Sequence, residues 1–215
     1  WLCAGQSNMV MPLNGFDYCP ISDSNNVIAD APNHPGIRMV TIKPTVKLSP
    51  QEYAEGSWQQ PTTENAPKFS AAAYHYALTL QRTLQIPIGV ITCAWGGSRV
   101  EGWLPKEILQ TYKDEDLTLI GSDKTPVYLQ SMLMYNGILY PCHKYTIKGF
   151  IWYQGESNVR SSRTYAERLA TMVKHWRSIW KQGDLPFYYV ETVPFACEYK
   201  EDGYIGALLL SLIHI

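Results

Sequence analysis

Several features that would define other classes of protein are missing from this chain of 215 residues. No apolar segment approaches the ~18 uninterrupted residues that a membrane-spanning helix needs. Lys and Arg total 18 while Asp and Glu total 19, so the formal net charge is -1. Because neither sign is in clear excess, charge offers no case for binding nucleic acid or an anionic membrane surface. We therefore expect neither partner, and the sequence leaves the oligomeric state open.

Paired cysteines at metal-binding spacing are also missing. The chain has no C-x-x-C pair, and no cysteine has a His at the spacing of a zinc ligand, so no metal site is predicted. The odd number of cysteines permits one or two disulfides with a thiol left over, or five reduced thiols, and does not settle the compartment. The cysteines are Cys3, Cys19, Cys93, Cys142 and Cys197.

The sequence has no initiator Met and no charged leader, and it begins inside an apolar run. We expect residue 1 to be a cut in a longer protein, so the missing targeting signal carries no information. Hydrophobic residues make up 46% and charged residues 17%, a balance typical of globular proteins. The length predicts one domain or part of one.

Short apolar runs alternate with helical patterns along the chain. Runs rich in β-branched residues and bounded by turn residues predict strands, and apolar residues at helical spacing predict helices. This order predicts an α/β fold with a mostly parallel sheet. The segment 20–67, rich in Pro, Asn, Ser and Thr, is predicted to be irregular and lid-like apart from one strand. The predicted strands are 2–4, 36–42, 87–94, 148–153 and 186–191, and the predicted helices are 68–85 and 164–181.

Three punctuated motifs each follow one of the predicted strands. Because the carboxyl ends of parallel strands lie at one edge of a sheet, we expect the motifs to meet there and form one site. The motifs are Gly5-Gln6-Ser7-Asn8-Met9, Trp95-Gly96-Gly97-Ser98 and Gln154-Gly155-Glu156-Ser157-Asn158.

The residue types in these motifs suit acyl transfer. Ser7 follows a glycine that permits a tight turn and would present its hydroxyl as a nucleophile at a strand-to-helix junction. The backbone N–H of Gly97, or alternatively that of Gly96, and the side-chain amide of Asn158 could donate hydrogen bonds to a developing oxyanion. Gln6, Gln154 and Glu156 are assigned to substrate contact or to support of the catalytic groups.

Structural explanations of the same residues compete with these roles. Ser7 could be only a helix N-cap, the glycine pair only a tight turn, and Asn158 only a cap for its loop. We interpret Arg99 and Glu101 as solvated surface charges in preference to contacts at the rim of a site. Buried packing is favoured over sugar stacking for a set of aromatic residues. These are Trp58, Trp95, Trp103, Trp152 and Tyr153.

Taken together, the stretches "GQSNM", "WGGSRVEGW" and "WYQGESN" resemble the first three conserved blocks of the SGNH hydrolases, and most closely those of the sialate O-acetylesterase family. The resemblance runs from Trp1 to about Leu209. It implies a three-layer α/β/α sandwich, hydrolysis of O-acetyl esters on sugars such as acetylated sialic acids, and no metal or organic cofactor. It also implies an extracellular, periplasmic or lysosomal location. By this resemblance Ser7 is the nucleophile, and a glycine of the 96–97 pair and Asn158 are oxyanion donors.

The general base that this family takes from a later Asp-x-x-His block has no counterpart here. No Asp in the chain has a His three residues on, and the nearest approximation, Asp30 with His34, is four apart and precedes the other blocks. We expect the chain to be a partial domain, 1–209, followed by a non-native tail, 210–215 ("LSLIHI"). We also expect this polypeptide, without its base, to be inactive or nearly so.

Two alternatives stay open at this point. An acetylxylan esterase or another polysaccharide esterase of the same superfamily would use the same acyl-transfer groups, since these say little about the sugar. A catalytically dead domain that binds glycans or packs against a partner belongs to another class. The downstream sequence distinguishes this last alternative, because a catalytic protein should contain the Asp-x-x-His block.

Overall fold

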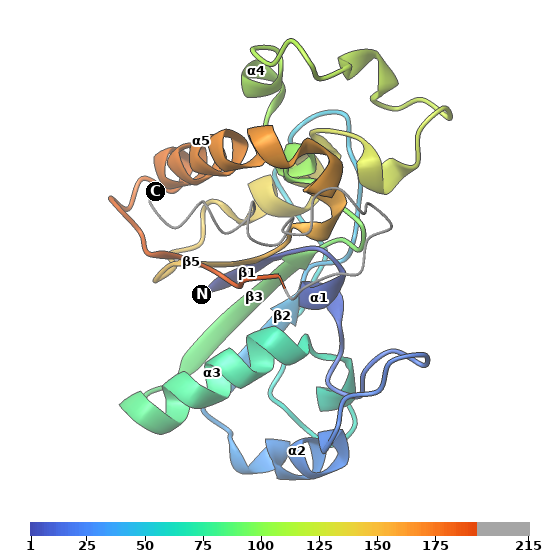
Figure 1. The fold of residues 1–215 in the computed structure, drawn as a ribbon. Coiled ribbons are helices and arrows are strands. Elements are labelled where there is room, and N and C mark those ends of the chain that lie inside the picture. Colours follow the sequence, from blue (N-terminus) through green and yellow to red (C-terminus); the bar gives the residue numbers. More distant parts are fainter. Residues whose placement is uncertain (193–215) are drawn as a thin grey trace.

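A computed structural model of the chain describes residues 1–192. Its centre is a sheet of five strands, all parallel, in the order β2-β3-β1-β4-β5. Helices lie on both sides of this sheet (Figure 1), which confirms the predicted three-layer α/β fold. The strands are β1 (Leu2–Gly5), β2 (Ile37–Thr41), β3 (Ile88–Ala94), β4 (Phe150–Tyr153) and β5 (Phe187–Tyr189).

The central strand β1 shows why these short apolar runs form strands. Alternate side chains of a strand point to opposite faces of the sheet. Leu2 and Ala4 pack into one hydrophobic core and Cys3 into the other. All four residues of β1 are buried, so both faces of the strand are covered. A run without polar residues is what a strand in this position requires.

The long helix α3 (Ala71–Leu84) covers one face of the sheet and contacts β2 and β3. Its small residues Ala73 and Ala77 are fully buried, which lets the helix approach the sheet closely. The helix begins after Ser70, whose hydroxyl oxygen accepts a hydrogen bond from the Ala73 N–H at 3.3 Å. This cap explains why the observed helix starts later than the predicted range 68–85.

Helix α5 (Ser162–Trp180) covers the other face and matches the predicted helix 164–181 closely. Its buried side chains, including Trp176, pack against Phe150 and Trp152 of β4. Trp152 also meets Trp103 edge to face, with ring centroids 5.8 Å apart and planes at 87°. The expected buried packing is therefore confirmed for Trp103 and Trp152, whereas Trp58 is 42% exposed.

Shorter helical segments connect these elements. The prediction that 20–67 is irregular apart from one strand was wrong for Ser24–Asp30, which forms α2. This helix buries no residue, so it lacked the apolar periodicity that would have identified it. The remaining α-helices are α1 (Ser7–Val10) and α4 (Lys106–Leu109), and Tyr135–Leu139 is a π-helix. The 3₁₀ segments are Ala31–Asn33, Ala66–Lys68, Val100–Trp103, Leu117–Leu119, Val127–Leu129, Tyr140–Cys142 and Glu156–Ser161.

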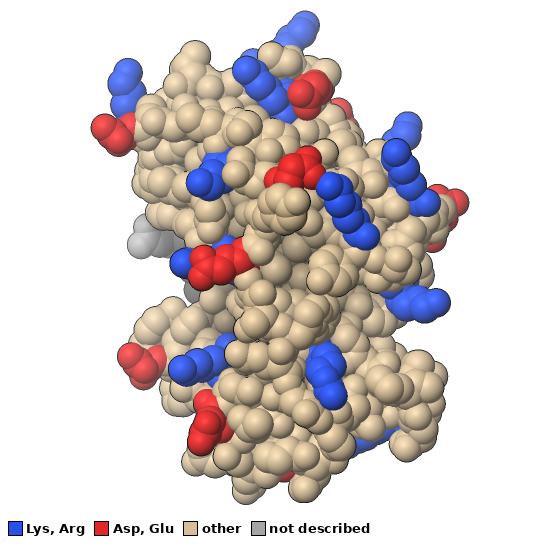
Figure 2. Space-filling view, turned by 180° about the vertical axis from the view of Figure 1, so that it is seen from behind, with Lys and Arg blue, Asp and Glu red and all other residues tan. Residues whose placement is uncertain are grey.

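Charge is spread over the surface in agreement with the near-neutral composition. On the face drawn in Figure 2, basic and acidic side chains are interspersed and neither kind forms a continuous patch. No helix within residues 1–192 is both long and apolar enough to span a membrane. Four of the cysteines, namely Cys3, Cys19, Cys93 and Cys142, are free thiols.

Candidate active site

The strand register brings the three motifs to one edge of the sheet. Gly5, the last residue of β1, pairs with Ala94 of β3 on one side and with Tyr153 of β4 on the other. The residues that follow β1, β3 and β4 therefore leave the sheet side by side, at the carboxyl ends of its strands. This is the position where open parallel sheets hold their functional groups.

Gly5 makes this close convergence possible. Its φ is +147°, and a Cβ at this position would lie 2.1 Å from the carbonyl oxygen of Tyr153. A side chain at residue 5 would therefore clash with the backbone of β4. The turn is held by hydrogen bonds on both sides: Gln6 N–H donates to Tyr153 O, and Trp95 N–H donates to Gly5 O, both at 3.0 Å.

Ser7 is the first residue of α1 and is half-buried, as the predicted strand-to-helix junction requires. A Cβ at Gly96 would lie 4.0 Å from the Cβ of Ser7, which places Gly96 directly beside the serine. Gly97 has φ +74°, and a Cβ there would meet the Tyr128 ring at 2.8 Å. Within residues 1–192 the backbone N–H groups of Ser7, Gly96 and Gly97 donate no hydrogen bond.

Side chains join the first motif to the third. The Oε1 atom of Gln6 accepts hydrogen bonds from the N–H groups of Gly155 and Ser157, each at 3.3 Å. The Asn8 amide donates to Glu156 Oε1 at 2.6 Å. The second carboxylate oxygen of Glu156 is buried and has no partner among the residues that the structure describes.

Asn158 joins the second motif to the third and is fully buried. Its Oδ1 accepts from the Val100 N–H at 2.9 Å and from Gln154 Nε2 at 2.8 Å. Its Nδ2 lies 3.0 and 3.2 Å from the two carboxylate oxygens of Glu101 and 3.2 Å from Ser161 Oγ. The Asn158 amide therefore donates its hydrogen bonds to groups within the protein. Its role as an oxyanion donor stays a prediction.

Glu101 is fully buried, so the interpretation of this residue as a solvated surface charge was wrong. The physical reason is its partner Arg168 on α5, which is 67 residues away in sequence and forms an ion pair with it. Arg168 also pairs with Asp114 at 2.6 Å and with Glu115 at 3.4 Å. Burial alone would lower the pKa of Arg168, but the hydrogen bond and the charges of these carboxylates raise it.

A second set of hydrogen bonds positions Gln154. Its Nε2 donates to the Ser98 carbonyl oxygen at 3.0 Å as well as to Asn158. The backbone carbonyl oxygen of Gln154 accepts from the Tyr165 hydroxyl at 2.9 Å, and that hydroxyl accepts from Trp152 Nε1. Burial raises the pKa of Tyr165, so the phenol stays protonated and able to donate.

No histidine among residues 1–192 forms a hydrogen bond with the three motifs. His34 does pair with Asp30 at 2.8 Å. Both residues precede β2 in the chain, so they lie at the amino ends of the strands, whereas the three motifs lie at the carboxyl ends. His214 and the predicted tail 210–215 lie outside the described residues. Cys3 offers no alternative nucleophile, because burial raises the pKa of its thiol to about 12.

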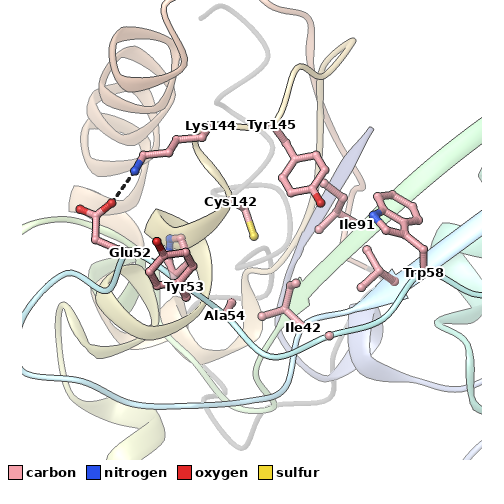
Figure 3. A pocket seen from close by; sticks show the side chains of 12 residues that line it. Ile42, Glu52, Tyr53, Ala54, Trp58, Ile91, Cys142, Lys144 and Tyr145 are labelled. Atoms are coloured by element: carbon pink, nitrogen blue, oxygen red, sulfur yellow. Dashed lines mark hydrogen bonds and ion pairs between the residues drawn. The ribbon is translucent and has the colours of Figure 1, made fainter.

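A separate hollow of about 390 Å³ opens over β2 and β3. In Figure 3 the rings of Trp58 and Tyr145 lie next to each other at one side of it, with centroids 6.3 Å apart, while Lys144 and Glu52 form an ion pair at its other side. None of the predicted site residues lines this hollow. It is therefore distinct from the meeting point of the three motifs.

Within residues 1–192, no cluster of His, Cys, Asp or Glu has the arrangement of a metal site.

The fold and the site define an α/β protein of the hydrolase type, with a serine at the carboxyl end of a parallel sheet beside backbone N–H groups that donate no hydrogen bond within residues 1–192. A family model described as "Carbohydrate esterase, sialic acid-specific acetylesterase" matches residues 1–204. The chain belongs to this family of carbohydrate esterases.

Relatives with known names support the assignment. Sialate O-acetylesterases of Pongo abelii and Homo sapiens are each 27% identical over 192 residues, which cover 85% of this chain and 36% of theirs. A carbohydrate acetylesterase from Xanthomonas citri has a structure that superposes with a TM-score of 0.83 at 30% identity, covering 99% of this chain and 45% of that one. An Arabidopsis thaliana protein shares the fold, with a TM-score of 0.60 at 19% identity. The chain spans less than half the length of the relatives named first.

Proposed function

We propose that this chain is part of a serine esterase that removes O-acetyl groups from sugars through an acetyl-Ser7 intermediate. The observation that carries the proposal is the register that aligns Gly5 with Ala94 and Tyr153. Ser7 lies beside Gly96, and its neighbours Gln6 and Asn8 form hydrogen bonds with the third motif. The names of the family and of the relatives supply the substrate class, an acetylated carbohydrate.

The reaction we infer has two steps. The Ser7 hydroxyl oxygen attacks the acetyl carbonyl carbon, and the serine proton passes through a general base to the departing sugar oxygen as the ester bond breaks. Water then attacks the acetyl-enzyme, which releases acetate and returns a proton to Ser7. In both steps the tetrahedral oxyanion would lie against the free N–H groups of Ser7 and of Gly96 or Gly97.

No histidine within residues 1–192 forms a hydrogen bond with the three motifs, so the general base of this reaction needs a proposal of its own. A serine hydroxyl is a weak nucleophile unless a neighbouring base accepts its proton. We propose that an Asp-x-x-His segment beyond residue 215 provides the base. Export or a lysosomal location, which the family resemblance implies, likewise stays a proposal.

The substrate is tested on the extended protein, by which we mean the gene product read past residue 215. Acetate release is measured from O-acetylated sialic acid and from acetylated xylan. A sialate esterase should turn over the first at least tenfold faster by kcat/KM, and the reverse preference would favour a polysaccharide esterase. Ser7→Ala should abolish the release, whereas Ser178→Ala, a change at an exposed serine of α5, should leave it intact.

Two results would overturn the proposal. The first is an extended protein without an Asp-x-x-His segment and without esterase activity, which would favour the non-catalytic, glycan-binding alternative. The second is an active extended protein in which Ser7→Ala keeps its activity. We also expect the chain of 215 residues alone to release little acetate, because it lacks the base.

A further inference from the structure

The loop 121–131 presents an aromatic ring beside the second motif. Tyr128 in this loop is 41% exposed. A Cβ at Gly97 would lie 2.8 Å from the Tyr128 ring, so the ring fills the space that a side chain at Gly97 would take. The next glycine, Gly96, is exposed and lies beside Ser7. The ring is therefore one residue removed from the glycine that adjoins the proposed nucleophile.

The buried side chain of Gln130 holds this loop in shape. Its Oε1 accepts a hydrogen bond from the Gly121 N–H at 2.6 Å. Its Nε2 donates to the carbonyl oxygens of Ser122 at 2.9 Å and Thr125 at 2.8 Å. Gln130 is 3% exposed, so water competes little for these bonds. The position of the loop is thus fixed by the protein itself, without a ligand.

Arg99 ties the same loop to the second motif, which it follows directly in the chain. Its Nε donates to the Leu129 carbonyl oxygen at 3.0 Å, and its Nη2 lies 3.3 Å from Ser131 Oγ. The guanidinium also pairs with Glu115 at 2.8 Å, and the Arg99 side chain is only 25% exposed. Arg99 is therefore an anchor for the loop, which corrects its interpretation as a solvated surface charge.

An exposed apolar surface on a firmly held loop is the arrangement of a ligand-binding wall. Val127, the neighbour of Tyr128, is also exposed, at 40%. An acetylated sugar has two parts that could meet this surface. The methyl of the acetyl group is too small to cover a tyrosine ring, whereas a sugar ring has a face of C–H groups that is wide enough. Aromatic side chains gain much from covering such a face and lose few rotamers.

We propose that Tyr128 determines the preference for a sugar ester, by packing its ring against the sugar whose acetyl group lies at Ser7. This inference rests on the proposed esterase function and adds a residue that contacts the substrate. The packing is the same before and during the reaction, so it lowers KM and leaves kcat nearly unchanged. The bound sugar lies over Gly97 on the side that the ring occupies.

The first test compares two acetate esters in the extended protein. One is O-acetylated sialic acid or acetylated xylan, whichever the unaltered protein hydrolyses faster. The other is ethyl acetate, which has the same acyl group and no ring. We expect Tyr128→Ala to lower kcat/KM on the sugar ester by about 10–100-fold, mainly through KM, because the loss of a covered aromatic side chain has about this effect. On ethyl acetate it should stay within threefold.

Two matched variants control this comparison. Tyr128→Phe keeps the ring and should stay within threefold on both esters. Tyr145→Ala removes a tyrosine that is 53% exposed and lines the separate hollow, so it should stay within twofold on both. Tyr128→Leu keeps an apolar side chain against Gly97 without a flat ring. It should show the same selective loss as Tyr128→Ala and takes its place if that variant fails to fold.

The second test measures binding without turnover. Titration calorimetry of the sugar ester is carried out in the Ser7→Ala background, with and without Tyr128→Ala. The second substitution should raise Kd by about the factor by which it raises KM.

Three results would overturn the inference. The first is a value of kcat/KM on the sugar ester, or of Kd, that stays within threefold in Tyr128→Ala. The second is an equal loss on both esters through kcat, which would make the ring a support for the Gly97 loop. The third is a loss in Tyr128→Phe as large as in Tyr128→Ala, which would assign the contact to the hydroxyl. Failure of the esterase proposal itself would instead appear as turnover that survives Ser7→Ala.

Discussion

Replacing Arg168 by Met should destabilise the protein strongly, because Arg168 neutralises a buried carboxylate. The Arg168 side chain is 3% exposed and that of Glu101 is 0% exposed. Without the guanidinium, Glu101 would keep only a more distant cation, Arg99, whose Nε is 3.8 Å away. Removing one partner of a buried ion pair typically costs about 3–5 kcal/mol, which is a large share of the ~5–15 kcal/mol that stabilises most domains.

A comparison of two arginines isolates the effect of burial. Arg82 pairs with Asp30 at 3.1 Å, but the side chains are 58% and 44% exposed, so Arg82→Met should cost about 0–1 kcal/mol. Urea denaturation at 25 °C, followed by circular dichroism, measures both free energies of unfolding. The double variant Glu101→Gln with Arg168→Met should be more stable than Arg168→Met alone, because the unpaired charge is gone. The reasoning is refuted if Arg168→Met lowers the free energy of unfolding no more than Arg82→Met does. It is also refuted if adding Glu101→Gln to Arg168→Met does not raise that free energy.

Further predictions concern the turn at Gly5, the cap of helix α3 and the half-buried His175. Gly5→Ala should lower the free energy of unfolding by at least about 3 kcal/mol, since its Cβ would lie 2.1 Å from the carbonyl oxygen of Tyr153. It should also abolish esterase activity in the extended protein. A urea midpoint near that of the unaltered chain would contradict this. Ser70→Ala should cost about 1 kcal/mol through loss of the α3 cap, checked by thermal unfolding. Burial lowers the pKa of His175 below its usual 6.5, so the unfolded state binds more protons just below that pH. Stability should therefore fall as the pH drops from 6.5 toward the folded pKa of His175, and His175→Gln should flatten this dependence in urea titrations.

Much of the fold could be predicted because it depends on local patterns. The run Ile88–Ala94 is apolar and β-branched, and it forms a strand buried between two layers as expected. Helix α5 has an apolar stripe at helical spacing, and its observed bounds differ from the predicted ones by two residues or fewer. The convergence of the three motifs also followed from topology, since parallel strands end at a common edge.

The buried ionic cluster was not predictable in the same way. Glu101 follows a glycine pair and the polar residues Ser98 and Arg99, and charged residues in such loops are usually solvated. Its burial depends on Arg168, whose position opposite Glu101 is set by the packing of α5 on the sheet. A single sequence gives no sign of a pair separated by 67 residues. The same tertiary contact determines how the Asn158 amide is oriented.

Trapping the acyl-enzyme tests the central claim most directly, namely that the three motifs form one esterase site around Ser7. The extended protein would be mixed with 4-nitrophenyl acetate, quenched in acid within milliseconds to seconds, digested and mapped by mass spectrometry. The account predicts an acetyl group on the peptide that contains Ser7, and no such adduct in Ser7→Ala. An acetyl group that forms elsewhere at the rate of turnover, or turnover that continues in Ser7→Ala, would contradict it.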